Sequence, residues 1–161
     1  MLCRIQIISN PCITKFLLLL FDVFRVAGCH SLEPRSGVNW PCGSVSKRSS
    51  MAGFYSGLLD GSLLESDMLE QLTREHSIGP DKTLLTQTRF GLDCMLDQPQ
   101  LPNATFGLGP RAFGHPGAGG SVGFADPEHD VAFGFVTNTL GPYVLMDPRA
   151  QKLVGILAGC L

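Results

Sequence analysis

Two segments after residue 50 carry apolar residues at the spacing of an α-helix. In the first, 51–61, apolar side chains fall at positions i, i+3, i+4 and i+7 before a glycine that ends the pattern; they are Met51, Phe54, Tyr55 and Leu58, followed by Gly61. In the second, Ser66 stands where an N-cap is expected, and Asp67 and Glu70 suit the positive end of a helix dipole. Its inward-facing residues are expected to be Met68, Leu69 and Leu72. Both segments are therefore predicted to form amphipathic helices.

From residue 90 onward the pattern changes to the alternation of β-strands. Apolar residues at every second position of 90–96 predict a half-buried strand. Shorter strands are predicted at 112–115, 121–125 and 131–138. The sequence Asp-Pro-Glu-His-Asp at 126–130 predicts a turn, because proline presets its own φ and aspartate bonds the local backbone.

A third helix is predicted after the strands. Asp147 is placed to cap it, and Pro148 occupies a first helical position that needs no N–H. Its apolar stripe comprises Ala150, Leu153, Val154, Leu157 and Leu161. We expect this helix to pack on the face of strand 131–138 that carries only the small residues Ala132 and Gly134. The order of elements predicts the α+β class, an antiparallel sheet with flanking helices.

Composition divides the 161 residues into two parts. Residues 1–49 are interpreted as an N-terminal segment and linker of low order, and 50–161 as the folded portion. The apolar run 16–21 resembles a weak signal peptide but is followed by the charged residues Asp22 and Arg25, so the localisation stays open. No apolar stretch reaches the roughly 18 residues of a membrane span, and no transmembrane helix is predicted.

Charge and cysteine content exclude other classes. The formal net charge is −2 and the basic residues are not clustered, so nucleic acid is not predicted as a partner. Six cysteines occur without a Cys-x-x-Cys pair, which argues against a zinc site or a disulfide scaffold. Cys94 and Cys160 are interpreted as small buried apolar residues.

The segment 111–124 carries the strongest candidate chemistry. An apolar approach leads to His115, then to a turn with several glycines, then to a second apolar run. Glycines let a ligand approach backbone N–H groups closely at the end of a strand. Taken alone, His115 either lines such a site or is an ordinary surface histidine in a turn.

Several segments together resemble a known family. The pattern Met-Ala-x-Phe-Tyr-x-x-Leu-Leu-x-Gly at 51–61 is followed by Thr-Arg-Phe-Gly-Leu-Asp at 88–93, Phe-Gly-His-Pro-Gly-Ala-Gly-Gly-Ser at 113–121, Gly-Phe-Ala-Asp-Pro at 123–127 and Asp-Pro-Arg-Ala at 147–150. This order closely resembles the C-terminal part of beta-lactamase-related serine hydrolases, which include class C beta-lactamases, penicillin-binding proteins and family VIII esterases. The resemblance covers about 50–161 and implies part of the serine beta-lactamase-like fold.

The resemblance implies an acyl transfer to serine that uses no metal and no cofactor, with a small acyl ester or amide as substrate. Three motifs serve this reaction in the family: Ser-x-x-Lys, Tyr-x-Asn, and a Lys-Thr-Gly or His-x-Gly on a strand edge. The serine needs a neighbouring base, and backbone N–H groups hold the developing oxyanion. By this resemblance His115 and Gly117 match the third motif, and Ala118 matches the position whose N–H serves the oxyanion hole. Pro116 stands where many relatives have threonine.

The other two motifs do not carry over in the same way. No Tyr-x-Asn occurs, and the one Ser-x-x-Lys is Ser44-Val-Ser-Lys47, which lies much closer to His115 than the family nucleophile does. Our interpretation is a portion of a serine hydrolase that keeps the substrate-edge strand and is inactive alone. The alternative is an active esterase or amidase that uses Ser44 with Lys47, or a complementing chain.

Strand 131–138 predicts one further property. Residues 1–49 contain no segment that we expect to pair beside it, and the run Val-Ala-Phe-Gly-Phe-Val has no charge and no proline. An open strand of this kind pairs readily with other chains. We therefore expect self-association through this edge.

Overall fold

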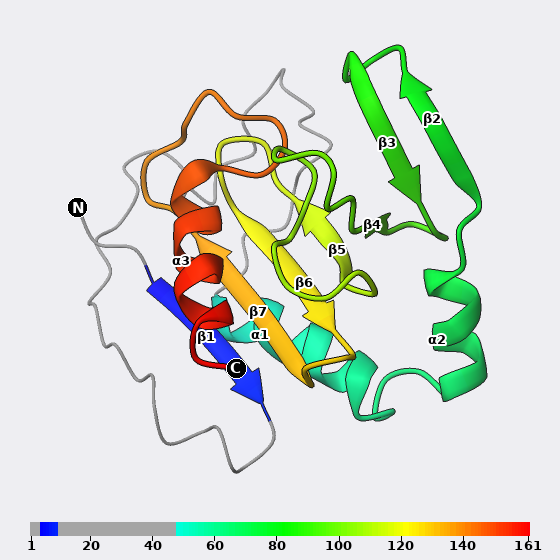
Figure 1. The fold of residues 1–161 in the computed structure, drawn as a ribbon. Coiled ribbons are helices and arrows are strands. Elements are labelled where there is room, and N and C mark those ends of the chain that lie inside the picture. The colour runs from blue at the N-terminus through cyan, green and yellow to red at the C-terminus, as the bar shows by residue number, and fades with distance from the viewer. Residues whose placement is uncertain (1–3, 10–47) are drawn as a thin grey trace, which may run out of the picture.

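The computed structural model describes residues 4–9 and 48–161. A seven-stranded antiparallel sheet with the order β1-β7-β6-β5-β4-β3-β2 separates helix α3 on one face from helix α1 on the other (Figure 1). The helices are α1 (Arg48–Leu59), α2 (Ser66–Thr73) and α3 (Pro148–Ala158). The strands are β1 (Arg4–Ser9), β2 (Ser77–Asp81), β3 (Thr86–Phe90), β4 (Met95–Leu96), β5 (Phe113–Pro116), β6 (Val122–Asp126) and β7 (Val131–Val136). The predicted α+β class is confirmed.

The face of the sheet under α3 holds the main core. The register places Phe124 of β6 opposite Phe133 of β7, and their rings stack at 5.0 Å. Phe106, from the loop before β5, stacks on Phe124 at the same distance. These rings share one buried cluster with the α3 residues Ala150, Val154 and Leu157. Each buried phenylalanine side chain contributes about 1.5–3 kcal/mol of transfer free energy, so this layer dominates the stability of the domain.

Strands β6 and β7 carry small residues on the opposite face of the sheet, and α1 packs there. A Cβ added at Gly123 would lie 2.6 Å from both Met51 and Tyr55, so only glycine lets the helix come this close. The prediction that the small face receives the last helix is therefore wrong. Ala150, Val154 and Leu157 of α3 pack against the phenylalanine rings, whereas Gly123 on the opposite face leaves room for the large side chains of α1.

Helix α3 begins as its sequence predicts. Asp147 is the N-cap and accepts a hydrogen bond from the backbone N–H of Arg149 at 2.8 Å, with Pro148 in the first turn. At the far end Leu161 is exposed, so the predicted stripe stops at Leu157. None of the helices in the described ranges combines the length and hydropathy needed to cross a membrane.

Helices α1 and α2 are less buried than their apolar patterns predict. Phe54 and Met68 are exposed, and α2 has no fully buried residue. Glu65, not Ser66, is the N-cap of α2, and it makes no side-chain capping bond. The inward contacts of α2 come from Leu69 and Leu72, which pack half-buried against Leu58 and Phe113.

The predicted strand 90–96 is divided into two pieces. Strand β3 ends at Phe90, β4 begins at Met95, and Asp93 between them has a φ of +58°. The bend seats Gly91 where an added Cβ would lie 2.2 Å from the carbonyl oxygen of Leu72, so α2 and this bend interlock. Alternation along the sequence does not reveal such a bend, because Met95 is buried as well as Cys94.

The hairpin β2–β3 is not foreseen by the alternation of apolar residues. Its turn is held by Asp81, whose Oδ1 accepts hydrogen bonds from the N–H groups of Thr83 and Leu84 at 2.7 and 2.9 Å. The hairpin stands beside α2 at the side of the molecule away from β1 (Figure 1). No residue of β2 and only Thr88 of β3 is fully buried, and this explains the absence of a clear apolar pattern.

Strand β7 is not an edge of the sheet. Strand β1 pairs with it antiparallel from Arg4 opposite Val136 to Ser9 opposite Val131. The expectation that nothing before residue 50 pairs beside 131–138 is therefore wrong, because six residues near the start of the chain supply a neighbouring strand. The free edges of the described sheet are β1 and β2.

The two described cysteines differ in their surroundings. Cys94 is buried, as predicted, and burial raises the pKa of its thiol to about 11. Cys160 is exposed, contrary to the prediction, because it follows the last turn of α3.

Candidate functional site

His115 projects from the end of β5 on the face that α1 covers. It is exposed, lies opposite Gly123 in the register, and its ring centre is 6.4 Å from that of Phe90. Its Nδ1 lies 2.7 Å from the carbonyl oxygen of Pro116. Because a carbonyl only accepts, Nδ1 must carry a proton and donate it. The Nε2 atom is then the nitrogen available to a ligand.

The turn that follows His115 satisfies most of its own backbone. Gly117 donates to the carbonyl of Ser121 at 2.7 Å, Gly120 donates to the carbonyl of Gly117 at 3.0 Å, and Gly119 donates to the carbonyl of Tyr143 at 2.8 Å. Ala118 is exposed, and its N–H makes no hydrogen bond within the described part of the chain. The structure therefore presents the Ala118 N–H to solvent beside His115.

Two glycines give the turn its shape. Gly119 and Gly120 have φ values of +94° and +112°, which side chains rarely adopt. At Gly120 an added Cβ would also lie 2.4 Å from Oδ2 of Asp147. The turn is thus pressed against the N-terminus of α3, and no larger residue fits at this position.

Tyr55 of α1 packs against β5 on the face of the sheet that α1 covers. It is largely buried, its ring lies 6.3 Å from Phe113, and its hydroxyl takes a hydrogen bond from the backbone of His115. Burial, and to a smaller extent Cys94, raise the pKa of this hydroxyl to about 12. Tyr55 therefore stays neutral near neutral pH, and it acts as a support for the strand rather than as a base.

The predicted site residues fall into two groups. His115, Gly117 and Ala118 are brought together on one turn. Ser44 and Lys47 lie outside the described residues. Sequence reasoning missed Arg149, whose side chain donates a hydrogen bond to the Gly119 carbonyl in this turn. The Asp-Pro-Arg segment that contains it was noted only as a helix start.

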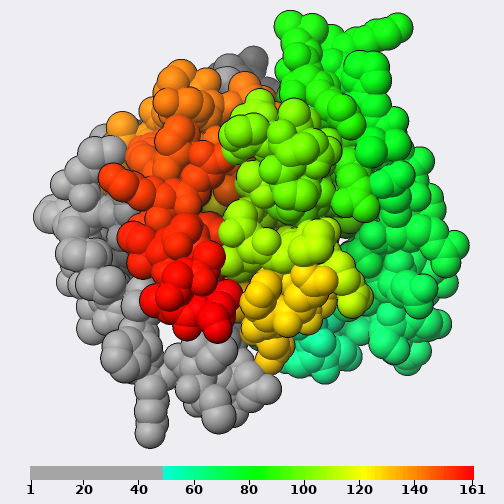
Figure 2. Space-filling model, in the orientation of Figure 1, coloured from blue at the N-terminus to red at the C-terminus, as the bar shows by residue number. Residues whose placement is uncertain are grey.

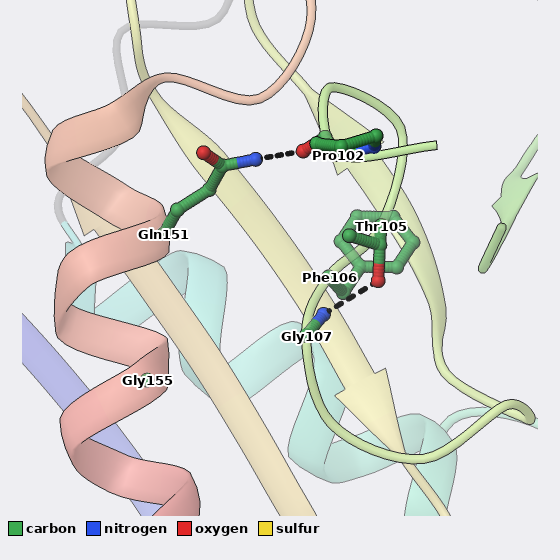
Figure 3. A pocket seen from close by; sticks show the side chains of 6 residues that line it. All are labelled: Pro102, Thr105, Phe106, Gly107, Gln151 and Gly155. Atoms are coloured by element: carbon green, nitrogen blue, oxygen red, sulfur yellow. Dashed lines mark hydrogen bonds between the residues drawn. The ribbon is translucent and has the colours of Figure 1, made fainter. Parts of the chain in front are cut away.

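A pocket of about 250 Å³ lies on the other face of the sheet. It is lined by Pro102, Thr105, Phe106, Gly107, Gln151 and Gly155 (Figure 3). The Gln151 side-chain amide donates to the carbonyl of Pro102 across it. In the space-filling view, α3 and the loop that carries this pocket lie side by side (Figure 2). Because Phe106 and α3 belong to the phenylalanine face, the sheet separates this pocket from His115.

Two buried carboxylates hold the loop between β4 and β5. Asp97 accepts from the backbone N–H of Phe106 at 2.5 Å and from the Thr105 hydroxyl at 3.0 Å. Asp126 accepts from the backbone N–H of Gly109 at 2.8 Å. Burial raises the pKa of the Asp97 carboxyl, despite these hydrogen bonds. Both carboxylates satisfy loop amides, which is a structural role.

The described residues contain no cluster of three or more His, Cys, Asp or Glu side chains placed to bind a metal ion. The chemistry available at the β5–β6 turn is therefore that of an imidazole nitrogen and a backbone N–H. The backbone N–H donates to an acyl oxygen or a carboxylate, and Nε2 does so only when the ring is doubly protonated, because Nδ1 holds the single proton of the neutral ring.

Comparisons with known proteins find similar sequences and similar folds. The family model described as Beta-lactamase matches residues 24–156. The esterase/beta-lactamase LipL of Mycobacterium tuberculosis is 32% identical over 111 residues, which are 64% of this chain and 24% of that protein.

Solved structures are similar as well. A penicillin-binding protein homologue from Caulobacter crescentus is 30% identical with a TM-score of 0.63, over 70% of this chain and 31% of that one. A family VIII carboxylesterase is 28% identical with a TM-score of 0.60, over 69% of this chain and 31% of that one. EstA from Arthrobacter nitroguajacolicus Rue61a is 29% identical with the same TM-score and the same coverage.

The chain spans about a quarter to a third of the length of these relatives. The residues that the family model matches, 24–156, include the β5–β6 turn, the strands β2 to β7, helices α1 and α2, and most of α3. This chain belongs to the beta-lactamase family of serine hydrolases, with esterases and penicillin-binding protein homologues among its relatives.

Proposed function

We propose that this chain provides the substrate-binding edge of a beta-lactamase-family hydrolase and does not turn over substrate by itself. His115, in its doubly protonated form, donates a hydrogen bond from Nε2 to the acyl substrate, and the Ala118 N–H contributes to the oxyanion hole. The substrate class is a small ester or amide. The observation that carries the proposal is the Ala118 N–H, which has no hydrogen bond within the described residues and lies next to an exposed imidazole, while the N–H groups of Gly117, Gly119 and Gly120 in the same turn are bonded.

The absence of turnover follows from chemistry that the chain lacks. Acyl transfer needs a nucleophile and a base within hydrogen-bond reach of each other. No Tyr-x-Asn occurs in the sequence, and Tyr55, the tyrosine nearest His115, is kept protonated by burial. Oxyanion stabilisation without a nucleophile leaves only a small residual rate over water.

Hydrolysis is tested with a chromogenic cephalosporin and a short-chain nitrophenyl ester. We expect no turnover above background, and no labelling of the chain by a serine-reactive fluorophosphonate. Turnover that disappears in Ser44→Ala would contradict the proposal.

Binding is tested separately by titrating butyrate, an acyl product, while recording amide ¹H–¹⁵N signals. We expect the amides of residues 115–121 to shift, and both His115→Ala and Ala118→Pro to abolish the shifts. Gln151→Ala, which alters only the pocket on the opposite face, serves as the matched control. Shifts confined to the residues around Gln151 would assign binding to that pocket instead.

An active hydrolase is the second candidate. It is favoured by the Ser44-Val-Ser-Lys47 match, which ends directly before α1. In this case Ser44 attacks the acyl carbon while Lys47 accepts its proton, the alcohol or amine leaves with that proton, and water then cleaves the acyl-serine bond to release the acid. Alternatively, a complementing chain supplies both groups. Labelling with the fluorophosphonate distinguishes an active Ser44, an active complementing chain and an inactive chain, because it labels Ser44, the partner chain, or neither.

A further inference from the structure

Arg149, on the first turn of α3, forms a bidentate ion pair with Asp147, the N-cap of the same helix. Its Nε donates to Oδ1 of Asp147 at 2.9 Å, and its Nη2 donates to Oδ2 at 2.7 Å. Asp147 is buried, and about a quarter of the Arg149 side chain, 27%, is exposed. A planar guanidinium holds a carboxylate in this way with both distance and orientation defined.

The same guanidinium reaches two other segments of the chain. Nη2 donates to the carbonyl of Gly119 at 3.3 Å, in the β5–β6 turn. Nη1 donates to the Thr137 hydroxyl at 3.1 Å and to the Thr139 carbonyl at 3.0 Å, just beyond β7. One side chain therefore joins the turn after β5, the end of β7 and the start of α3.

Glycines on both sides bring the backbone directly against this pair. An added Cβ at Gly120 would lie 2.7 Å from Nη2 of Arg149, and one at Gly141 would lie 2.9 Å from the same atom. Gly141 in turn donates its N–H to the Gly119 carbonyl at 2.8 Å. The Gly119 carbonyl is thus held by two donors, and the Gly119–Gly120 peptide to which it belongs has little freedom to rotate.

We propose that Arg149 is the positioning residue of the β5–β6 turn: by holding the Gly119 carbonyl and Asp147 together, it keeps the Ala118 N–H turned outward for an acyl oxygen. This inference rests on the proposed function of that N–H. Lysine cannot substitute, because an ammonium is a point charge without the planar arrangement of donors that spans Asp147, Gly119 and Thr139.

The test compares Arg149→Lys and Arg149→Ala with the unmodified chain. Arg89→Lys is the matched control, since Arg89 also forms a partly exposed ion pair, with Glu75 at 2.7 Å, and donates to a backbone carbonyl, that of Asp97 at 3.0 Å. The readouts are the ¹H–¹⁵N signals of residues 118–120, their hydrogen-exchange rates, butyrate binding, and the melting temperature.

We expect Arg149→Lys to move the amide signals of residues 118–120, to speed exchange at Gly119 and Gly120 at least tenfold, and to weaken butyrate binding at least tenfold. The control should leave all three at their original values. Millimolar methylguanidinium should return the signals of Arg149→Ala toward their original positions, which a general loss of stability would not allow.

Unchanged signals and unchanged exchange at residues 118–120 in Arg149→Lys would overturn the inference. If the alanine variant does not fold, the lysine variant decides. If the unmodified chain does not bind butyrate, the proposed function fails, whereas the amide signals and exchange rates still decide whether Arg149 positions the turn.

Discussion

His115 and Ala118 owe their accessibility to the residues around them. The Nδ1 proton of His115 is engaged by the Pro116 carbonyl, and this leaves Nε2 toward solvent. Ala118 lies in a turn where the neighbouring N–H groups are bonded to backbone carbonyls. Within the described residues, Nε2 of His115 and the N–H of Ala118 therefore have no hydrogen-bond partner, as a ligand-binding edge requires.

His115→Ala tests the role of the imidazole in a full-length relative that carries this C-terminal sequence. We expect kcat/KM to fall by roughly tenfold to a thousandfold, because one oriented donor contributes about 1.4–4 kcal/mol to the transition state. The melting temperature should change little, since the side chain is exposed. Activity equal to that of the unmodified enzyme would make His115 an ordinary turn residue.

Gly120→Ala tests the packing beneath the turn. The φ of +112° and the 2.4 Å approach of an added Cβ to Asp147 both oppose alanine. We expect a loss of more than about 2 kcal/mol in the free energy of unfolding, measured by urea denaturation. Gly155→Ala, on the exposed side of α3 where an added Cβ meets nothing, is the control and should be neutral or stabilising.

At the scale of elements, the start of α3 combines two tasks. Asp147 caps the helix and also receives the guanidinium of Arg149. Hydrogen bonds from Arg149, together with its charge, lower the pKa of the Asp147 carboxyl below its usual range. The helix start and the β5–β6 turn are therefore coupled through one ionised carboxylate.

The free energy of unfolding should depend on pH through the ionisation of the Asp147 carboxylate. A carboxyl group whose pKa is lowered by folding stabilises the native state above the unfolded pKa, about 3.9, and loses this contribution as the pH falls through the folded value. We expect the unmodified chain to be more stable than Asp147→Asn near pH 6, and the difference to shrink below about pH 4. Urea denaturation from pH 3 to 7 measures it, and a constant difference across this range would contradict the ionised pair.

At the scale of the whole molecule, β1 closes the edge of the sheet that β7 would otherwise expose. Its partners are the residues 131–136, which carry neither charge nor proline. The other edge, β2, contains Pro80 and Asp81, and such residues discourage pairing with a second chain. Self-association therefore depends on whether β1 stays in place.

Ile7→Pro tests this dependence. Proline in the middle of β1, opposite Phe133, removes a donor from the strand and disfavours its pairing with β7. We expect the variant to form larger species than the unmodified chain, measured by size-exclusion chromatography with light scattering. Ser31→Pro, in the segment between β1 and α1, is the control for proline itself. Identical size distributions for both variants would show that β1 does not protect this edge.

Much of the site was predictable from local sequence. The cap at Asp147, the strands around His115 and the glycine turn after it follow from the residue types at those positions, because caps, turns and alternation are local properties of the backbone. The motif order at 51–61, 113–121 and 147–150 also identified the family, which the family match confirmed.

Only the tertiary structure decided which faces and edges meet. The small face of β7 could accept either helix, and α1 rather than α3 lies there, with its large side chains against Gly123, while α3 packs on the phenylalanine rings of the other face. The pairing of β1 with β7 joins residues more than a hundred positions apart, and the Arg149 bonds to Gly119 and Thr139 cross between elements. Such contacts depend on packing and on distances through space, which a periodic pattern along the chain does not encode.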